Sequence, residues 1–163
     1  MIRTTMCNRL GALLSVTAAL FLAGCETGVK NPEAWLHENI SYLNDVVMKL
    51  RKSSILRVQS DKYETAAKYS SSDADAALYD ELKKFIDRTG VTSISVVRRR
   101  LEGDTHTLAG VSFHVKESWK PFELSAVDVV YTEPGVDPQG FFWDASCTKA
   151  EAPSWFICPS KPK

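Results

Sequence analysis

The chain has 163 residues, with 20 Lys and Arg side chains balanced by 20 Asp and Glu side chains. A formal net charge of zero excludes a general electrostatic attraction to nucleic acid or to anionic lipid, because either would need an excess of basic residues. Hydrophobic residues make up 44% of the chain, and its length is sufficient for one domain with its own core.

Residues 1–24 have the pattern of a secretory signal peptide. Arg3 and Arg9 form a short positive head, and residues 10–24 contain no charged side chain. As a helix this apolar run would measure about 22 Å, which is shorter than the ~30 Å hydrocarbon core of a bilayer. A buried helix of the folded domain is the alternative, but such a helix would show a polar face. The sequence therefore predicts a cleaved leader.

The leader ends in the residues LAGC, 22–25, which resemble the lipobox of bacterial lipoprotein precursors. The resemblance covers the first 25 residues and implies a diacylglycerol on the Cys25 sulfur, cleavage after Gly24 and acylation of the new N-terminus, for example with palmitate. Two or three acyl chains, at about 0.8 kcal/mol per buried methylene, form a permanent membrane anchor. Glu26 stands where Asp is the usual signal for inner-membrane retention. The resemblance thus implies an outer-membrane location facing the periplasm, with the inner membrane less favoured.

Cleavage would leave 139 residues, of which 18 are basic and 20 acidic, so that the mature formal charge is −2. We expect residues 25–31 to be a short tether and residues 32–163 to form a single domain. Cys7 leaves with the leader and Cys25 carries lipid, so Cys147 and Cys158 remain. In an oxidising compartment these two thiols most simply form a disulfide. Zinc is the alternative, but no C-x-x-C and no His–Cys pair at ligand spacing lies nearby.

The first predicted helix begins with Asn31 as N-cap and Pro32 at the first helical position, and it runs to about Lys52. Its apolar residues recur at spacings of four and three, which is one face of a helix. These residues are Leu36, Ile40, Leu43, Val47 and Leu50. This stripe is predicted to be core rather than a zipper for a partner helix.

A second helix is predicted between Ser72 and Gly90. Ser72 and Asp75 resemble a capping box, and Gly90 is the expected C-cap. The segment between the helices, residues 53–72, has a weaker pattern. Ile55 to Val58 fit either a short strand or a continued helix, and residues 61–72 fit one or two helical turns.

Beyond Gly90 the hydrophobic period changes from 3.6 to 2, which predicts strands over 91–100, 105–116, 122–132, 141–147 and 154–158. In the second of these, strict alternation places Leu108 with Ser112 and His114 on one face, and Thr107 with Phe113 on the other. Helices followed by antiparallel strands predict an α+β fold, two helices packed on an antiparallel sheet of about four to five strands. This order resembles cystatin-like and NTF2-like folds, which host many functions.

No motif of catalysis or metal binding is present. His37 is isolated, His106 and His114 stand about 27 Å apart along a strand, and no H-E-x-x-H pair occurs. A nucleophile elbow and phosphate-binding glycine loops are also missing. We therefore expect no catalytic residue, metal or cofactor, and interpret the protein as a non-enzyme. The basic run 98–100 favours a solvated strand end over an anion-binding patch.

Two acidic residues fall among apolar ones. Asp128 interrupts the alternation in residues 125–131, and Asp144 follows three aromatic residues. Each fits either a partly buried acid in a cleft or a solvent-facing position, and the second is favoured.

The aromatic residues Phe141, Phe142 and Trp143 are consecutive, so in a strand they cannot all face one core. Together with Trp155 they predict an aromatic partner-binding surface, because Trp carries much of the binding energy at interfaces. Packing into the core is the alternative. The sequence thus favours a non-catalytic, membrane-anchored module that binds a protein partner in the envelope, as an envelope or secretion-system accessory or an inhibitor or immunity-type protein. The other hypothesis is a small-ligand pocket between the helices and the sheet.

Overall fold

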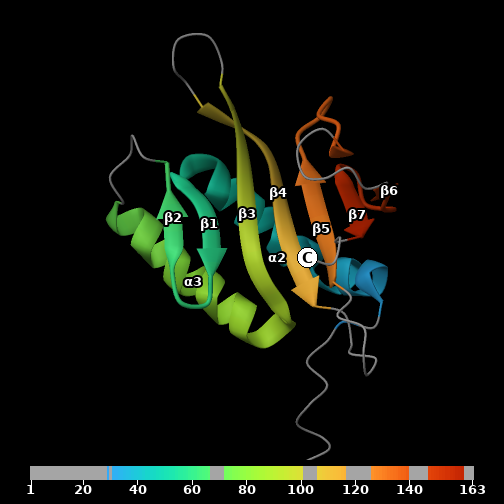
Figure 1. Ribbon diagram of the computed structural model, residues 1–163, viewed down its shortest axis with the longest axis horizontal. Coiled ribbons are helices and arrows are strands. Elements are labelled where there is room, and N and C mark those ends of the chain that lie inside the picture. The colour runs from blue at the N-terminus through green and yellow to red at the C-terminus, as the bar shows by residue number, and fades with distance from the viewer. Residues whose placement is uncertain are drawn as a thin grey trace, which may run out of the picture.

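The computed structural model describes residues 29, 31–66, 72–100, 106–116, 126–139 and 147–159 (Figure 1). For Arg100, His106 and Lys116 it describes the backbone only. The predicted leader, Cys25, Asp144 and the aromatic residues 141–143 lie outside the described residues. Within them, no helix is long and apolar enough to cross a membrane.

The described chain forms helices on one antiparallel sheet, so the α+β class is confirmed. The elements in chain order are α2 (Pro32–Lys52), β1 (Ile55–Gln59), β2 (Tyr63–Thr65), α3 (Asp73–Thr89), β3 (Val91–Arg100), β4 (His106–Lys116), β5 (Ala126–Thr132), β6 (Thr148–Lys149) and β7 (Trp155–Pro159). The strand order is β2-β1-β3-β4-β5-β7-β6, and every neighbouring pair is antiparallel. The sheet has seven strands, more than the predicted four to five.

The additional strands come mainly from the segment whose pattern is weak. Residues 55–65 form the hairpin β1–β2, so the helical turns predicted there are wrong for Tyr63–Thr65. Ile55 and Val58 are fully buried, and the pairing register shifts between Ile55 and Arg57. The Tyr63 ring packs on the Tyr79 ring of α3 with centroids 4.8 Å apart. Packing on α3 and pairing with β3 thus hold a hairpin whose own sequence pattern is ambiguous.

Both predicted helices are confirmed with their caps. The Asn31 side chain accepts hydrogen bonds from the backbone N–H groups of Glu33 and Ala34, at 3.0 and 3.2 Å. Ser72 and Asp75 form the expected capping box at the start of α3. Gly90 ends that helix in the left-handed conformation, with φ of 74°, which glycine adopts at little cost.

The two helices cover the same face of the sheet (Figure 1), with α3 against β1 and β3 and α2 against β4 and β5. They run in opposite directions, because Trp35 near the start of α2 lies 6.3 Å from Phe85 near the end of α3, between ring centroids. Near the end of α2, Lys49 contacts Glu81, which lies at the middle of α3. The helices therefore meet the sheet as an antiparallel pair with two distinct ends.

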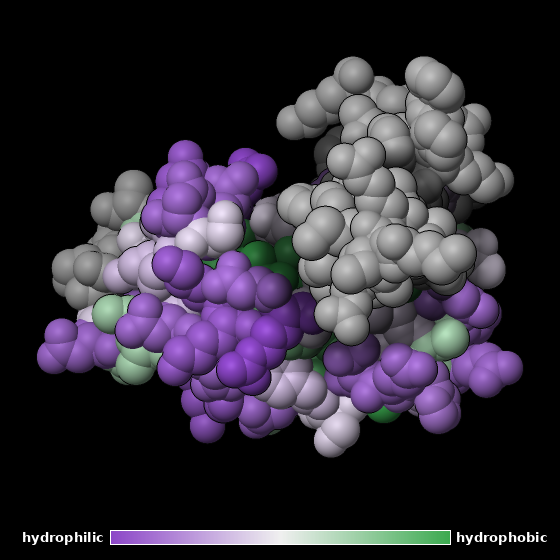
Figure 2. Space-filling model, turned by 90° about the horizontal axis from the view of Figure 1, so that it is seen from below, coloured by the Kyte–Doolittle hydropathy of each residue, from purple (hydrophilic) through white to green (hydrophobic). Residues whose placement is uncertain are grey.

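The space between helices and sheet is filled by apolar side chains. Among the largest that are fully buried are Leu43, Val46 and Leu50 from α2, Leu82 from α3, and Ile94, Val111, Phe113, Val129 and Trp155 from the sheet. The described outer surface is largely hydrophilic where Figure 2 shows it, and apolar side chains are visible mainly in a recess between polar groups. Among the large hydrophobic side chains of the described residues, Met48 is the exposed one, at 48%.

A β-bulge in β4 corrects the predicted alternation. Val97 pairs with Gly110, but the next residue of β3, Arg98, pairs with Leu108, so Ala109 is the extra residue. The bulge reverses the facing of the residues before it. Leu108 is therefore buried in the core at 6% exposure, and Thr107 is exposed, the opposite of the strict alternation.

Candidate functional site

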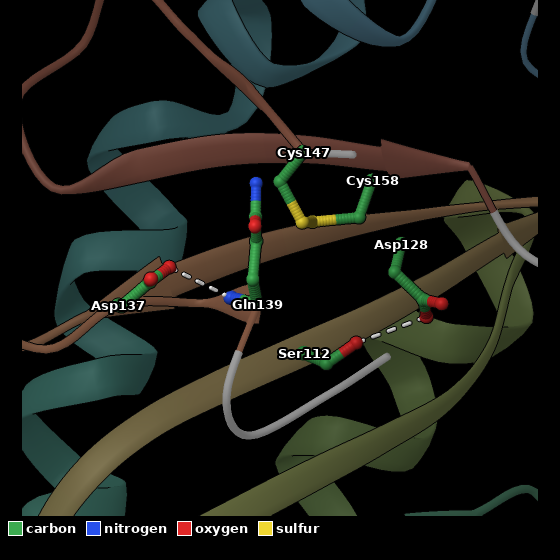
Figure 3. Close-up of a disulfide and its surroundings, with 6 residues drawn as sticks. All are labelled: Ser112, Asp128, Asp137, Gln139, Cys147 and Cys158. Carbon is green, nitrogen blue, oxygen red and sulfur yellow. Dashed lines mark hydrogen bonds between the residues drawn. A yellow bond between two sulfur atoms is a disulfide. The ribbon is translucent and has the colours of Figure 1, made fainter. Parts of the chain in front are cut away.

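Cys147 and Cys158 form a disulfide, as predicted (Figure 3). Strands β6 and β7 form a hairpin in which Thr148 pairs with Ile157, and this places the two cysteines opposite each other with Cα atoms 4.2 Å apart. Cys158 is fully buried, whereas Cys147 is half-buried. The disulfide therefore links the start of the edge strand β6 to its neighbour β7.

Trp155 belongs to the core and not to the surface. It is 1% exposed and packs against Phe113 and Tyr131, with ring centroids 6.0 and 5.5 Å away. Its indole N–H donates to Asn44 Oδ1 of α2 at 3.2 Å. The structure thus gives Trp155 a packing role in place of the predicted partner contact. Phe141, Phe142 and Trp143 lie outside the described residues, so their role stays a prediction.

A buried carboxylate lies on the sheet face opposite the helices. Asp128 is 2% exposed, so the favoured solvent-facing position is wrong. Its Oδ1 accepts a hydrogen bond from Ser112 Oγ at 2.9 Å (Figure 3) and lies 3.0 Å from His114 Nδ1. In the register, His114 stands opposite Asp128, and Asp128 stands opposite Cys158. Directly opposed residues share a face, so His114, Asp128 and Cys158 form one row across β4, β5 and β7, and this row ends at the disulfide.

Ser112, His114 and Asp128 have the residue types of a serine triad but a different connectivity. In a triad the hydroxyl donates to the imidazole, which activates the nucleophile, and the carboxylate orients the far side of the ring. Here Ser112 donates to the carboxylate itself. The arrangement gives the buried carboxyl group hydrogen-bond partners, as a polar group removed from water requires. Among the described residues, no group of three or more His, Cys, Asp and Glu side chains is placed to hold a metal ion.

A groove of about 780 Å³ lies where α2 ends and α3 begins. Among the described residues, the basic side chains that line it are Lys49, Arg51 and Lys52 of α2 and Arg98 of β3, and the acidic ones are Asp75 and Glu81 of α3. The groove brings together residues of α2, α3 and β3, three elements that are separate in sequence. Sequence periodicity does not reveal such a site.

Arg98 forms the wall of the groove that belongs to the sheet. Its Nη2 atom donates to the carbonyl oxygens of Leu50, Ser53 and Ile55, at 2.9, 2.6 and 3.4 Å. Carbonyl groups at the end of a helix lack intrahelical donors and carry partial negative charge, so a guanidinium satisfies them well. Arg98 thus turns inward and caps α2, in place of the solvated strand end that the sequence favours.

Asp75 joins the start of α3 to the segment after α2. Its carboxylate accepts hydrogen bonds from the Ser54 hydroxyl at 2.6 Å and the Ser54 backbone N–H at 3.1 Å. Burial by itself would raise the pKa of Asp75, but the hydrogen bonds from Ser54 and Ser72 outweigh it, and the pKa lies below its ordinary value of 3.8. The carboxylate is therefore charged and fixed in place.

Lys49 bridges the two helices across the groove. Its Nζ lies 2.8 Å from Asp45 Oδ2 on its own helix and 2.8 Å from Glu81 Oε1 on α3. These two hydrogen-bonded carboxylates raise the pKa of Lys49. Beside them, burial and the negative charge of Glu81 raise the pKa of Tyr42 to about 12. Arg51 forms a separate pair with Glu133, which follows β5, at 2.5 Å.

Comparison of the chain with protein-family models, with curated proteins and with solved structures gives no match. The function is therefore argued from the residues and their geometry.

Proposed function

We propose that this protein is a lipid-anchored lipoprotein of the outer membrane, facing the periplasm, whose domain binds a protein partner without catalysing a reaction. The partner would belong to the envelope, as for an accessory of an envelope or secretion machine, or would be the target of an inhibitor or immunity-type protein. Binding of a small ligand is the alternative.

The anchor is supported by the LAGC motif and by how soon the fold begins after it. Val29 stands four residues after Cys25 and already packs, half-buried, against the hydrophobic core. At 3.3–3.6 Å per residue, an extended chain of this length spans about 14 Å at most. A lipid on Cys25 would therefore hold the domain directly against the membrane surface, within reach of partners in that membrane.

The filled interior is the observation that carries protein binding over ligand binding. A ligand pocket between helices and sheet needs apolar space there, with a few polar groups that orient the ligand. Leu43, Leu50 and Phe113 instead occupy that layer with no exposed surface. The groove at the end of α2 lies at the surface, and its described lining combines charged side chains with serines and a few apolar residues. This arrangement favours recognition of another macromolecule.

The anchor is tested with the substitution Cys25→Ser in the full chain, expressed in a bacterium that processes lipoproteins. The variant should remain unprocessed or become soluble, whereas the wild type fractionates with the outer membrane and incorporates labelled palmitate. Cys7→Ser is the matched control, because it removes a thiol from the leader without touching the predicted acylation site. Palmitate labelling of Cys25→Ser at the wild-type level would refute the anchor.

Partner binding is tested by crosslinking intact cells and purifying the wild type and Trp143→Ala. An interface anchor costs about 2 kcal/mol or more on truncation to Ala, so a specific partner band should disappear. His37→Ala, an exposed residue of α2, is the control that should keep the band. Identical partner sets for wild type and Trp143→Ala would contradict a partner contact and support packing of residues 141–143 into the core.

A further inference from the structure

We propose that Cys147 and Cys158 form a site of reversible thiol–disulfide exchange. An external dithiol reduces the bond, and Asp128 together with His114 supplies the proton that the buried sulfur needs. Because the bond links β6 to β7, its redox state also decides whether this edge of the sheet is covalently held. The inference goes beyond the proposed function and depends on neither the anchor nor the partner.

The two cysteines differ in their access to solvent. Cys147 is half-buried and stands directly before β6, whereas Cys158 is fully buried in β7. A thiolate must approach the sulfur that it attacks, so an external dithiol reacts at Cys147. Cys158 is then the leaving group. The difference in exposure thus gives each cysteine its own role in the exchange.

The leaving sulfur requires a proton because Cys158 has no contact with solvent. A thiolate released there would be a buried charge without water around it, and such a charge is costly unless a neighbouring group neutralises it. Burial in general favours a neutral thiol over a thiolate. Exchange at this bond therefore depends on a group beside Cys158 that supplies a proton.

Asp128 is the titratable group that stands next to this sulfur. It is 2% exposed and lies directly opposite Cys158 in the pairing of β5 with β7 (Figure 3). Directly opposed residues have Cβ atoms about 4.5–5.5 Å apart on the same face, a spacing that a carboxyl group and a thiol bridge with one hydrogen bond. In the disulfide form the carboxyl group contacts Ser112 and His114. The hydrogen bond to sulfur forms when reduction releases Cys158.

His114 connects Asp128 to solvent. Its Nδ1 atom lies 3.0 Å from Asp128 Oδ1, and its side chain is 36% exposed. Imidazole takes up and releases protons near neutral pH, so His114 returns to the carboxyl group the proton that the sulfur removes. Among the described residues, His114 and Cys158 are the titratable groups opposite Asp128 on its two neighbouring strands. Solvent, His114, Asp128 and Cys158 thus form a continuous path for a proton.

The exchange balances in electrons and protons. A thiolate of the dithiol attacks Cys147 Sγ, and the Sγ–Sγ bond breaks with its electron pair passing to Cys158 Sγ. Asp128 gives that sulfur a proton and regains one from solvent through His114. The second thiol of the dithiol loses its proton to water and attacks the mixed disulfide, so that Cys147 leaves as a thiolate and is protonated by water. The protein disulfide is reduced to two thiols, and the dithiol is oxidised to a disulfide.

The first test identifies the cysteine that reacts. The full chain with Cys7→Ser and Cys25→Ser is purified in neutral detergent micelles, so that Cys147 and Cys158 are its remaining cysteines. In this background, the single variants Cys158→Ser and Cys147→Ser are treated with glutathione disulfide, and the mixed disulfide is measured by mass spectrometry. Cys147 should react at least about tenfold faster than Cys158, because it is the accessible thiol. Equal rates, or a faster reaction at Cys158, would overturn the assignment of roles.

The second test measures the rate of reduction by dithiothreitol between about pH 5 and pH 8 in the same background, with each rate constant divided by the fraction of dithiothreitol present as thiolate. With Asp128 and His114 in place, this corrected rate constant should fall about tenfold as the pH rises, because the proton path loses its proton. Asp128→Asn and His114→Gln should each give a flat profile. Thr132→Val is the matched control, because it changes a buried polar residue of the same strand without removing a titratable group, and it should keep the fall.

Circular dichroism melts check that each variant keeps the fold. If Asp128→Asn unfolds, His114→Gln still decides the question, since His114 is partly exposed and its loss removes the link to solvent. A flat profile with both residues in place, or an unchanged fall in His114→Gln, would overturn the proton path. A reduction rate that does not depend on dithiothreitol concentration would show that the bond opens only on unfolding, and this would overturn the exchange site itself.

Discussion

Ser112 and Asp128 are diagonal neighbours on adjacent strands, and the hydroxyl of the first donates to the carboxylate of the second at 2.9 Å. Both side chains are buried, at 5% and 2% exposure, and they lie on the sheet face opposite the core residues Phe113 and Val129, which are their strand neighbours. His114 contacts the same carboxylate oxygen. This small polar network fixes the pairing of β4 with β5, because a shift by one residue would bury the carboxylate without these partners.

Asp128→Ala should lower the free energy of unfolding by about 2–4 kcal/mol, since it leaves Ser112 and His114 without their shared acceptor. Asp128→Asn keeps an acceptor oxygen and should cost less. Urea denaturation followed by circular dichroism measures both. A change below about 0.5 kcal/mol for Asp128→Ala, the range of ordinary surface substitutions, would contradict the burial.

Reduction of the Cys147–Cys158 disulfide should lower the free energy of unfolding by roughly 3 kcal/mol, because the bond closes a loop of about a dozen residues in the unfolded chain. Urea denaturation with and without dithiothreitol measures the difference. The double variant Cys147→Ser, Cys158→Ser should be insensitive to the reductant. Mass spectrometry of the protein alkylated without reductant provides an independent check, and two alkylated thiols at Cys147 and Cys158 would contradict the bond.

The bulge at Ala109 gives opposite expectations for two neighbouring residues. Leu108→Ala should cost about 2–5 kcal/mol of unfolding free energy, because it leaves a cavity in the core, whereas Thr107→Ala should change it by less than about 0.5 kcal/mol. Thermal and urea denaturation of the two variants compare them directly. A larger loss of stability for Thr107→Ala than for Leu108→Ala would contradict the bulge and support strict alternation along the strand.

Asp75 should make stability depend on pH in the acid range. The pKa of Asp75 in the folded state lies below its ordinary value of 3.8. The ionised Asp75 therefore stabilises the fold fully at pH values above 3.8, and this stabilisation is lost as the pH falls through the folded-state pKa. Wild type should therefore lose more stability than Asp75→Asn between about pH 5 and pH 2. Urea denaturation across this range measures the difference, with Asp80→Asn on the exposed face of the same helix as control. Parallel curves for wild type and Asp75→Asn would contradict the role of the Ser54 contacts.

The helices could be predicted from the sequence because their signals are local. Asn31, Ser72 with Asp75, and Gly90 each act within a few residues, and the structure places them as expected. The hairpin β1–β2 could not be predicted in the same way, since its strands are short and depend on β3 and α3 for pairing and packing. The disulfide followed from the number of cysteines, without reference to the fold.

The candidate sites were harder to predict for the same physical reason. The burial of Asp128 depends on partners from β4 across the sheet, and linear alternation shows only that it points away from Val127 and Val129. Arg98 was expected in solvent because it is charged and stands near a strand end, yet the carbonyl groups at the end of α2 draw it inward. Contacts between distant elements decide both cases.

The strands of the described sheet become shorter towards both edges, which limits how other molecules can pair with it. The central strands β3 and β4 have ten and eleven residues, whereas the outermost described strands, β2 and β6, have three and two. A strand at an edge leaves backbone N–H and C=O groups open to pairing, so short edge strands offer little template for strand addition or fibril growth. At high local concentration, the described edges of this sheet offer little for edge-to-edge assembly, which favours contacts made through side chains.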